Sequence, residues 1–150
     1  MPGLDKAALM RRWFQEVWNE GKTQIVLDHT HENLNATGQG EAGTAVRNPQ
    51  EFLVFVERMR GAFPDLKVTV HDAFEAGDQV VVRWSVTGTH RGDHLGVPPT
   101  GNPMTTSGIT IARFSGEKII EGWDSWDQLE MLKAIGAVQV PQARIMKAAS

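Results

Sequence analysis

Between residues 66 and 127, apolar side chains recur at every second position, and this pattern is the strongest constraint on the fold. A spacing of two is that of a β-strand with one buried face. The clearest run alternates with a more polar set of neighbours and comprises Val80, Val82, Trp84 and Val86. Turn residues at 76–78 and 115–117 divide the region into consecutive strands. The pattern therefore predicts an antiparallel meander of long strands.

The preceding residues have helical spacing instead. A first helix is predicted after the cap residue Asp5 and before Gly21, and its apolar stripe comprises Met10, Trp13, Phe14, Val17 and Trp18. A second begins at the cap residue Asn48 and ends near Gly61. A short helix is predicted at 23–29, and a short strand at 33–37 within a long loop. Helices followed by strands predict an α+β fold, with helices on one face of an antiparallel sheet.

Size and composition indicate one domain. The chain has 150 residues, 41% of them hydrophobic, which suffices for one core; we expect that core at about 5–136 and a tail at 137–150. The net charge of −3 comes without a Lys/Arg cluster, which argues against a nucleic-acid partner. No apolar run approaches the roughly 20 residues of a membrane span. Cysteine is absent, so the cytoplasm is the expected location.

Residues 121–127 are the most unusual stretch, because three carboxylates and two indoles occur within one strand end. Strict alternation puts Trp123 and Asp127 on one face and Asp124 on the other. A carboxyl group beside an aromatic wall in a dry pocket has a raised pKa, because a low dielectric disfavours the charged form. Such a group can transfer protons near neutral pH. Alternatively, Asp127 and Glu130 form the capping box of a following helix. The two roles are compatible.

Several motifs resemble one known family. They occur in the expected order at 62–66, 77–78, 82–84, 88–92, 96–101, 118–123 and 127–129. Together they resemble the SnoaL-like polyketide cyclases over roughly residues 9–136. The resemblance implies the nuclear-transport-factor-2-like fold, a cone of curved antiparallel sheet with helices packed into it. Members of the family close rings on polyketides by aldol chemistry, whereas relatives dehydrate, isomerise, open epoxides or only bind.

The resemblance also implies a catalytic aspartate near the end of the last strand. Asp127 matches this position because it shares a face with Trp123, and Asp124 is the alternative if the strand carries a bulge. His90 is either a proton-transfer group or a structural residue that fixes the following loop. For Glu121 we expect an ion pair with Arg113 or Arg83 rather than catalysis.

The remaining candidates would bind substrate. Large apolar side chains are expected as cavity wall: Trp123, Trp84, Val82, Trp13, Phe14, Phe55 and Met59. Asn35 corresponds in the resemblance to a cavity histidine of many relatives, so it would supply an amide in place of a base. Because the chain has no tyrosine, Asn35, Ser107 or an indole N–H would stabilise an enolate. His29 and His31 lack a third metal ligand at a recognisable spacing, so neither a metal nor a cofactor is expected.

The sequence is therefore consistent with two alternative functions. The first is a cofactor-independent enzyme that performs acid–base chemistry next to a carbonyl on a hydrophobic small molecule, by aldol cyclisation, isomerisation or dehydration. The second is a binding domain of the same fold without catalysis. The resemblance further implies a homodimer that pairs through the convex sheet face, on which we expect Val81, Arg83, Ser85 and Thr87.

Overall fold

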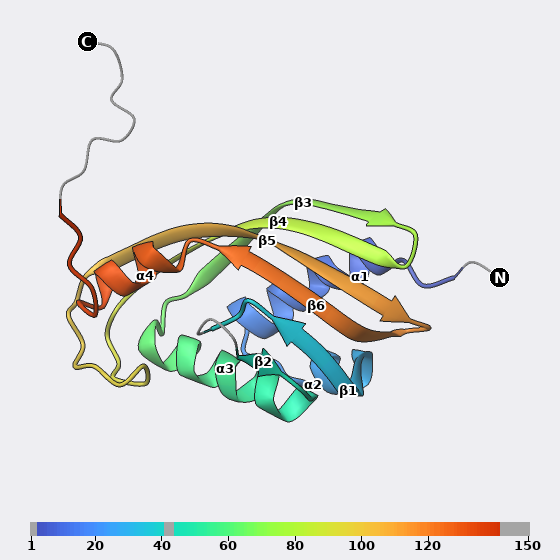
Figure 1. The fold of residues 1–150 in the computed structure, drawn as a ribbon, viewed down its shortest axis with the longest axis horizontal. Helices are drawn as coiled ribbons and strands as arrows, with labels where there is room; N and C mark the ends of the chain where they lie inside the picture. Colours follow the sequence, from blue (N-terminus) through green and yellow to red (C-terminus); the bar gives the residue numbers. More distant parts are fainter. Residues whose placement is uncertain (1–2, 41–43, 142–150) are drawn as a thin grey trace, which may run out of the picture.

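The computed structural model describes residues 3–40 and 44–141 of the chain. One curved, open sheet holds the described strands in the order β2-β1-β6-β5-β4-β3 (Figure 1). Its strands are β1 (Thr30–Thr37), β2 (Ala45–Val46), β3 (Lys67–Ala76), β4 (Gln79–Thr89), β5 (Pro103–Ser115) and β6 (Lys118–Trp126). The predicted meander is confirmed, because β3 to β6 pair antiparallel with their neighbours. Residues 142–150 of the predicted tail lie outside the described part.

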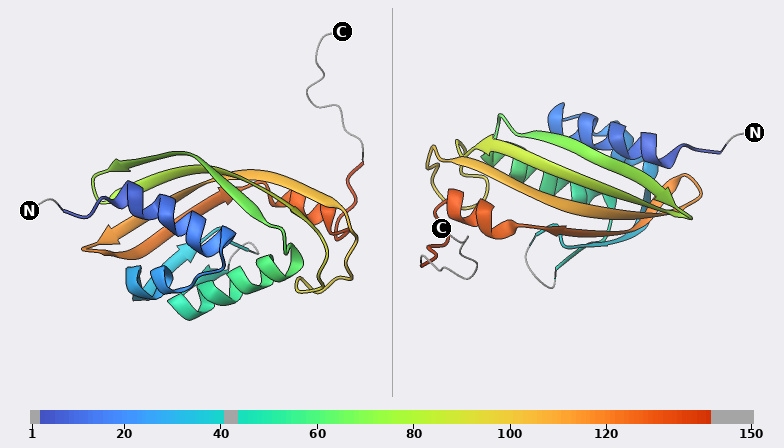
Figure 2. Two further views of the ribbon diagram at one scale, coloured as in Figure 1. Left: turned by 180° about the vertical axis from the view of Figure 1, so that it is seen from behind. Right: turned by 90° about the horizontal axis from the view of Figure 1, so that it is seen from above.

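The helices lie on the concave side of this sheet (Figure 2). They are α1 (Lys6–Trp13), η1 (Phe14–Asn19), α2 (Gln24–His29) and α3 (Pro49–Ala62), and α4 (Gln128–Ala134) follows β6 at one end. The helix α1 contacts β3 and β4, whereas α3 contacts β1 and β2 at the opposite edge. The expected α+β arrangement, with helices covering one sheet face, is therefore confirmed.

Local capping sets the helix starts, as the sequence predicts. The Ala8 N–H donates to Asp5 Oδ1 at 2.9 Å, and the Glu51 N–H donates to Asn48 Oδ1 at 2.8 Å. Each bond satisfies an amide that would otherwise lack a partner in the first helical turn. The first helix differs in its second half, because 14–19 is a π-helix. Such wide turns often occur at functional sites.

One strand pairing departs from the prediction. The sheet was expected to be antiparallel throughout, but β1 runs parallel to β6. Parallel neighbours need a long crossover between them, and here residues 38–117, between β1 and β6, supply it. The last strand therefore lies beside the first, and Asp124 of β6 lies next to Gly38, just past the end of β1.

A β-bulge in β6 determines which of its side chains point inward. Arg113 pairs with Glu121, whereas the next residue, Phe114, pairs with Ile119. Ile120 is therefore the extra residue. A bulge of one residue reverses the facing of all later side chains relative to strict alternation. Beyond it, the inward positions are Gly122, Asp124 and Trp126.

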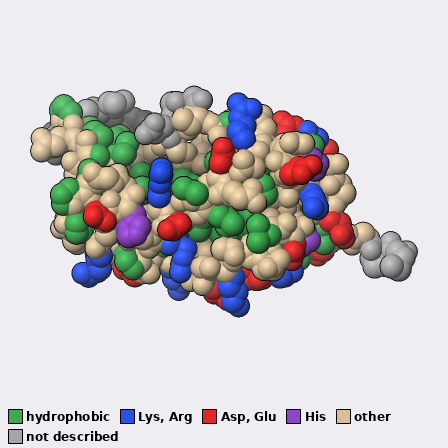
Figure 3. Space-filling view, turned by 90° about the horizontal axis from the view of Figure 1, so that it is seen from below, with side chains coloured by type: hydrophobic (Ala, Val, Ile, Leu, Met, Phe, Trp, Pro, Cys, Tyr) green, Lys and Arg blue, Asp and Glu red, His purple; other side chains and the backbone are tan. Residues whose placement is uncertain are grey.

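Charged side chains of both signs are interspersed on the underside of the molecule, with hydrophobic side chains between them (Figure 3). No basic stripe of the kind that tracks a nucleic-acid backbone dominates this face. Among the described residues, no helix has the length and apolar character required to cross a membrane.

Candidate active site

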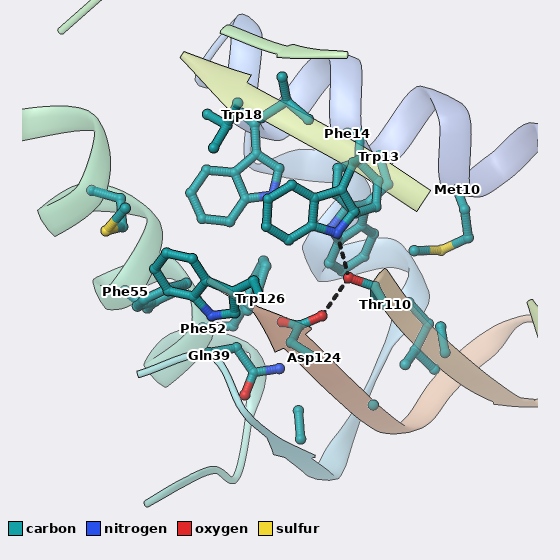
Figure 4. Close-up of a pocket in the computed structure, with 18 of the residues that line it drawn as sticks. Met10, Trp13, Phe14, Trp18, Gln39, Phe52, Phe55, Thr110, Asp124 and Trp126 are labelled. Carbon is teal, nitrogen blue, oxygen red and sulfur yellow. Dashed lines mark hydrogen bonds between the residues drawn. The ribbon is translucent and has the colours of Figure 1, made fainter. Parts of the chain in front are cut away.

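A cavity of about 100 Å³ lies between the helices and the concave face of the sheet (Figure 4). Its wall is mainly apolar and includes the aromatic rings of Trp13, Phe14, Trp18, Phe52, Phe55, Trp84 and Trp126. Asp124 is the one acidic or basic side chain among the described residues that line it. The site thus combines one carboxyl group with an apolar surround.

A short hydrogen-bonded chain holds Asp124 in place (Figure 4). The indole N–H of Trp84 donates to the Thr110 hydroxyl oxygen at 3.0 Å. Because that oxygen already accepts, the Thr110 hydroxyl donates to Asp124 Oδ1. Thr110 and Asp124 are direct cross-strand partners on β5 and β6. One oxygen of the carboxylate is therefore held by the Thr110 hydroxyl.

The environment of Asp124 brings its pKa close to neutral pH. Burial raises the pKa of Asp124 to about 6, and side-chain hydrogen bonding from Thr110 and Gln39 partly opposes this rise. Burial dominates because removing a carboxylate from water costs more than two neutral donors return. At neutral pH, Asp124 is therefore a base that can take a proton and return it.

The β1–β2 turn brings Gln39 to the same place. Gly38 has φ +91°, and an added Cβ there would lie 1.9 Å from the Asp124 carbonyl oxygen, so only glycine permits this approach. The Gly38 carbonyl accepts from Trp126 Nε1 at 2.8 Å and from Gln128 Nε2 at 3.3 Å. The Gln39 side chain is buried in the cavity wall, with its amide nitrogen turned toward Asp124 (Figure 4).

The predicted inward orientation of Asp127 is wrong. Its side chain is exposed and caps α4, accepting from the Glu130 N–H at 3.4 Å. Trp123 is also turned outward and is 39% exposed, so it forms no cavity wall. The bulge at Ile120 explains both errors, because it places Asp124 and Trp126 where strict alternation placed Asp127 and Trp123.

Three predicted binding residues also lie elsewhere. Asn35 and Ser107 are exposed on the outer face, and neither lines the cavity. Val82 is fully buried but packs in the core outside the cavity lining. By contrast, the predicted wall positions Trp84, Trp13, Phe14, Phe55 and Met59 do line it.

His90 occupies a structural position away from the cavity. It is fully buried, and its ring lies 5.7 Å from that of Phe63. Its Nδ1 is 3.1 Å from the Thr100 amide nitrogen, and the Thr100 hydroxyl donates to the Ala134 carbonyl at 2.9 Å. This geometry joins the 90–102 loop to α4, which favours the structural alternative over proton transfer.

The expected ion pair of Glu121 is confirmed, since Arg113 Nε donates to its Oε1 at 2.7 Å. No group of three metal-binding side chains comes together within residues 3–40 and 44–141. Gln39, Thr110 and Trp126 also line the cavity, although none of them was predicted from the sequence as a site residue. Trp126 lies on the same strand face as Asp124, so its place in the cavity wall could be inferred once the bulge in β6 is known.

Comparison with known proteins supports the resemblance. The family model described as SnoaL-like polyketide cyclase matches residues 8–135. The aklanonic acid methyl ester cyclase DauD of Streptomyces sp. (strain C5) is 30% identical over 130 residues, 85% of this chain and 80% of that protein. The aklanonic acid methyl ester cyclase DnrD of Streptomyces peucetius is 28% identical over 129 residues, 85% of this chain and 88% of that protein.

Solved structures agree. A candidate SnoaL-like polyketide cyclase from Jannaschia sp. CCS1 superposes with a TM-score of 0.77 at 26% identity, covering 88% of this chain and 92% of that chain. IdmH, a candidate polyketide cyclase from Streptomyces antibioticus, gives 0.73 at 27% identity, with coverages of 89% and 99%. The predicted nuclear-transport-factor-2-like fold and the expectation of a cyclase-type enzyme are confirmed at the level of the family. This chain belongs to the SnoaL-like polyketide cyclase family.

Proposed function

We propose that this protein catalyses a cofactor-independent intramolecular aldol cyclisation, with Asp124 transferring the proton on a flat, hydrophobic substrate that bears several carbonyl groups. One observation carries the proposal: a carboxyl group with a pKa of about 6 lies in a cavity otherwise lined by aromatic, aliphatic and neutral polar side chains. A group whose pKa lies near the working pH is suited to both steps of proton transfer.

The reaction needs one such group. The Asp124 carboxylate takes a proton from the carbon next to a carbonyl, and the C–H electron pair moves onto the carbonyl oxygen to give an enolate. The enolate carbon attacks a second carbonyl of the same molecule, forming the ring bond. The new alkoxide then recovers the proton from Asp124, so the enzyme ends the cycle unchanged.

The cavity wall suits such a substrate. Aromatic side chains from α1, η1, α3 and the sheet surround the carboxyl group, and flat rings stack favourably on other rings. Exclusion of water strengthens the electrostatic interactions inside the site and prevents the enolate from being quenched by solvent. The cavity of about 100 Å³ would hold the reacting part of a poly-carbonyl aromatic molecule in the folded conformation that ring closure requires.

Aklanonic acid methyl ester is the test substrate, because relatives are named as its cyclases. Turnover would be followed by chromatography of the cyclised product. We expect Asp124→Asn, which keeps the shape of the side chain but removes its base, to lower kcat by about 100-fold or more.

Asp127→Asn is the matched control, because Asp127 lies outside the cavity and asparagine caps helices as well as aspartate does. Its turnover should stay within about twofold of the unmodified protein. Equal turnover of the folded Asp124 variant would remove the proposed role. Tight binding of the ester without any product would instead support the non-catalytic alternative.

The convex sheet face supports a homodimer as a further proposal. In-register cross-strand pairs form one apolar row across four strands, made of Phe74, Val81, Ile111 and Trp123. Phe74 is 54% exposed, which is unusual for a side chain of that size. The predicted outward residues Val81, Arg83, Ser85 and Thr87 lie on this same face.

The row would bury its rings against a second copy of the chain, with rim ion pairs such as Arg83 to Asp72 beside it. Light scattering after size-exclusion chromatography should therefore give twice the chain mass. Trp123→Lys should shift the protein toward the monomer. A monomeric unmodified protein at micromolar concentration would contradict the dimer.

A further inference from the structure

An enolate needs a hydrogen-bond donor at its oxygen, and three donors that line the cavity are already committed to protein acceptors. The Trp84 N–H donates to the Thr110 hydroxyl oxygen, and that hydroxyl donates to Asp124. The Trp126 N–H serves the Gly38 carbonyl. Asn35 and Ser107, the donors that the sequence suggested, point to the outer surface.

Gln39 is different in two respects. Its carboxamide carries two N–H groups, of which Asp124 can take only one. It also lies beside the carboxyl group that receives the substrate proton (Figure 4). The carbonyl oxygen belongs to the carbon adjacent to the one that loses this proton, so its donor must stand next to Asp124. The other two indoles of the lining come from α1 and η1 on the opposite wall. The Thr30 hydroxyl also lacks a protein partner, but Thr30 pairs with Ile119 at the start of β6, five residues before Asp124.

Resting on the proposed cyclisation, we propose that Gln39 is the oxyanion donor of this site. When Asp124 takes the substrate proton it becomes neutral, and it is then a weaker hydrogen-bond acceptor for the Gln39 N–H. At the same moment, negative charge develops on the substrate oxygen next to that amide. The carboxamide therefore donates to the enolate oxygen, which it stabilises more strongly than the ground-state carbonyl.

The structure fixes this donor in advance. The turn that carries Gln39 is tied to β6 and α4 through the Gly38 carbonyl, which accepts from Trp126 and Gln128. The side chain itself is only 6% exposed. A donor that is already in place costs no reorganisation when charge develops, which is the condition for effective electrostatic catalysis.

Gln39→Met tests the role, since methionine has nearly the same shape without a donor. In the cyclisation assay, kcat should fall about 100-fold, the usual effect of removing one oxyanion donor, with KM nearly unchanged. Gln24→Met, an exposed glutamine on α2, is the control and should retain full turnover. An unchanged kcat in folded Gln39→Met, or a loss confined to KM, overturns the proposal. Gln39→Leu repeats the test if the methionine variant does not fold.

A binding measurement separates this inference from the proposed function. Asp124→Asn mimics the neutral acid present alongside the enolate, and 1-naphthol is a flat phenol whose oxygen stands in for the enolate oxygen. In that background, adding Gln39→Met should weaken 1-naphthol binding about tenfold and leave naphthalene binding unchanged. Equal affinities for 1-naphthol with and without Gln39 would reject the donor role. If Asp124→Asn retains turnover while 1-naphthol still depends on Gln39, the proposed function fails and the donor stands.

Discussion

Replacing Asp124 with asparagine should make the folded protein more stable at alkaline pH. The pKa of Asp124 is about 6 in the folded state, against an ordinary value of 3.8. At 1.36 kcal/mol per pH unit, the ionised carboxylate costs the folded state about 3 kcal/mol. Asparagine keeps the shape and an oxygen for the Thr110 hydroxyl, and it never ionises. The Asn variant should therefore be more stable than the unmodified protein at pH values where Asp124 is ionised.

The sign of the pH dependence follows from linkage. A carboxyl group whose pKa is raised on folding favours the folded state while protonated, fully so below pH 3.8, and loses this contribution as pH rises through 6. Urea unfolding at pH 4 to 8 should show the Asn variant ahead by about 3 kcal/mol at pH 8, with the difference shrinking toward pH 4. Asp127→Asn should follow the unmodified protein throughout. A constant difference, or a less stable Asn variant at pH 8, would refute the buried-acid account.

Two further predictions concern the surroundings of Asp124. Thr110→Val removes a hydrogen bond that lowers the pKa of Asp124, so the acidic limb of kcat/KM against pH should move to higher pH; an unmoved limb would show that the hydroxyl does not act on the carboxylate. Gly38→Ala should destabilise the protein by about 2 kcal/mol or more and lower turnover, because the added Cβ meets the Asp124 carbonyl. Gly96→Ala is its control in urea unfolding, since Gly96 also has positive φ but open space at Cβ. Equal losses of stability in the two variants would show that backbone strain, and not the contact with Asp124, accounts for the effect.

The local features of the fold were predictable, because the signals are local. Asp5 and Asn48 cap their helices through side chains three residues before the amide they satisfy. The period-two spacing of β4 correctly placed Trp84 on the concave face. For Asn35, the sequence held a usable signal: Leu34 and Ala36 alternate with it, and they are the residues that face the cavity.

The face of the catalytic acid was not predictable in the same way. The bulge at Ile120 depends on how β5 and β6 pair across their turn, and no single residue type specifies it. Hydrophobic alternation also misleads in β5, where Thr110 faces the cavity and Ile109 faces outward, 44% exposed. The concave and convex faces of β5 differ little in polarity, because the convex face of the sheet carries the apolar row that includes Ile111.

Gln39 had no sequence signal. It lies in a segment rich in glycine and polar residues, without periodicity. Its place in the cavity depends on the tertiary contact of Gly38 with β6 and on the parallel pairing of β1 with β6. Contacts of this kind join residues more than 80 positions apart, such as Gly38 and Trp126, and only the assembled sheet reveals them.

The pKa of Asp124, measured from its side-chain carboxyl carbon by NMR across pH 3 to 9, tests the central claim most directly. A buried acid poised for proton transfer should titrate with a midpoint of about 6, and the acidic limb of the cyclisation rate should share that midpoint. A midpoint near 4, as for a carboxyl group in water, would contradict the account.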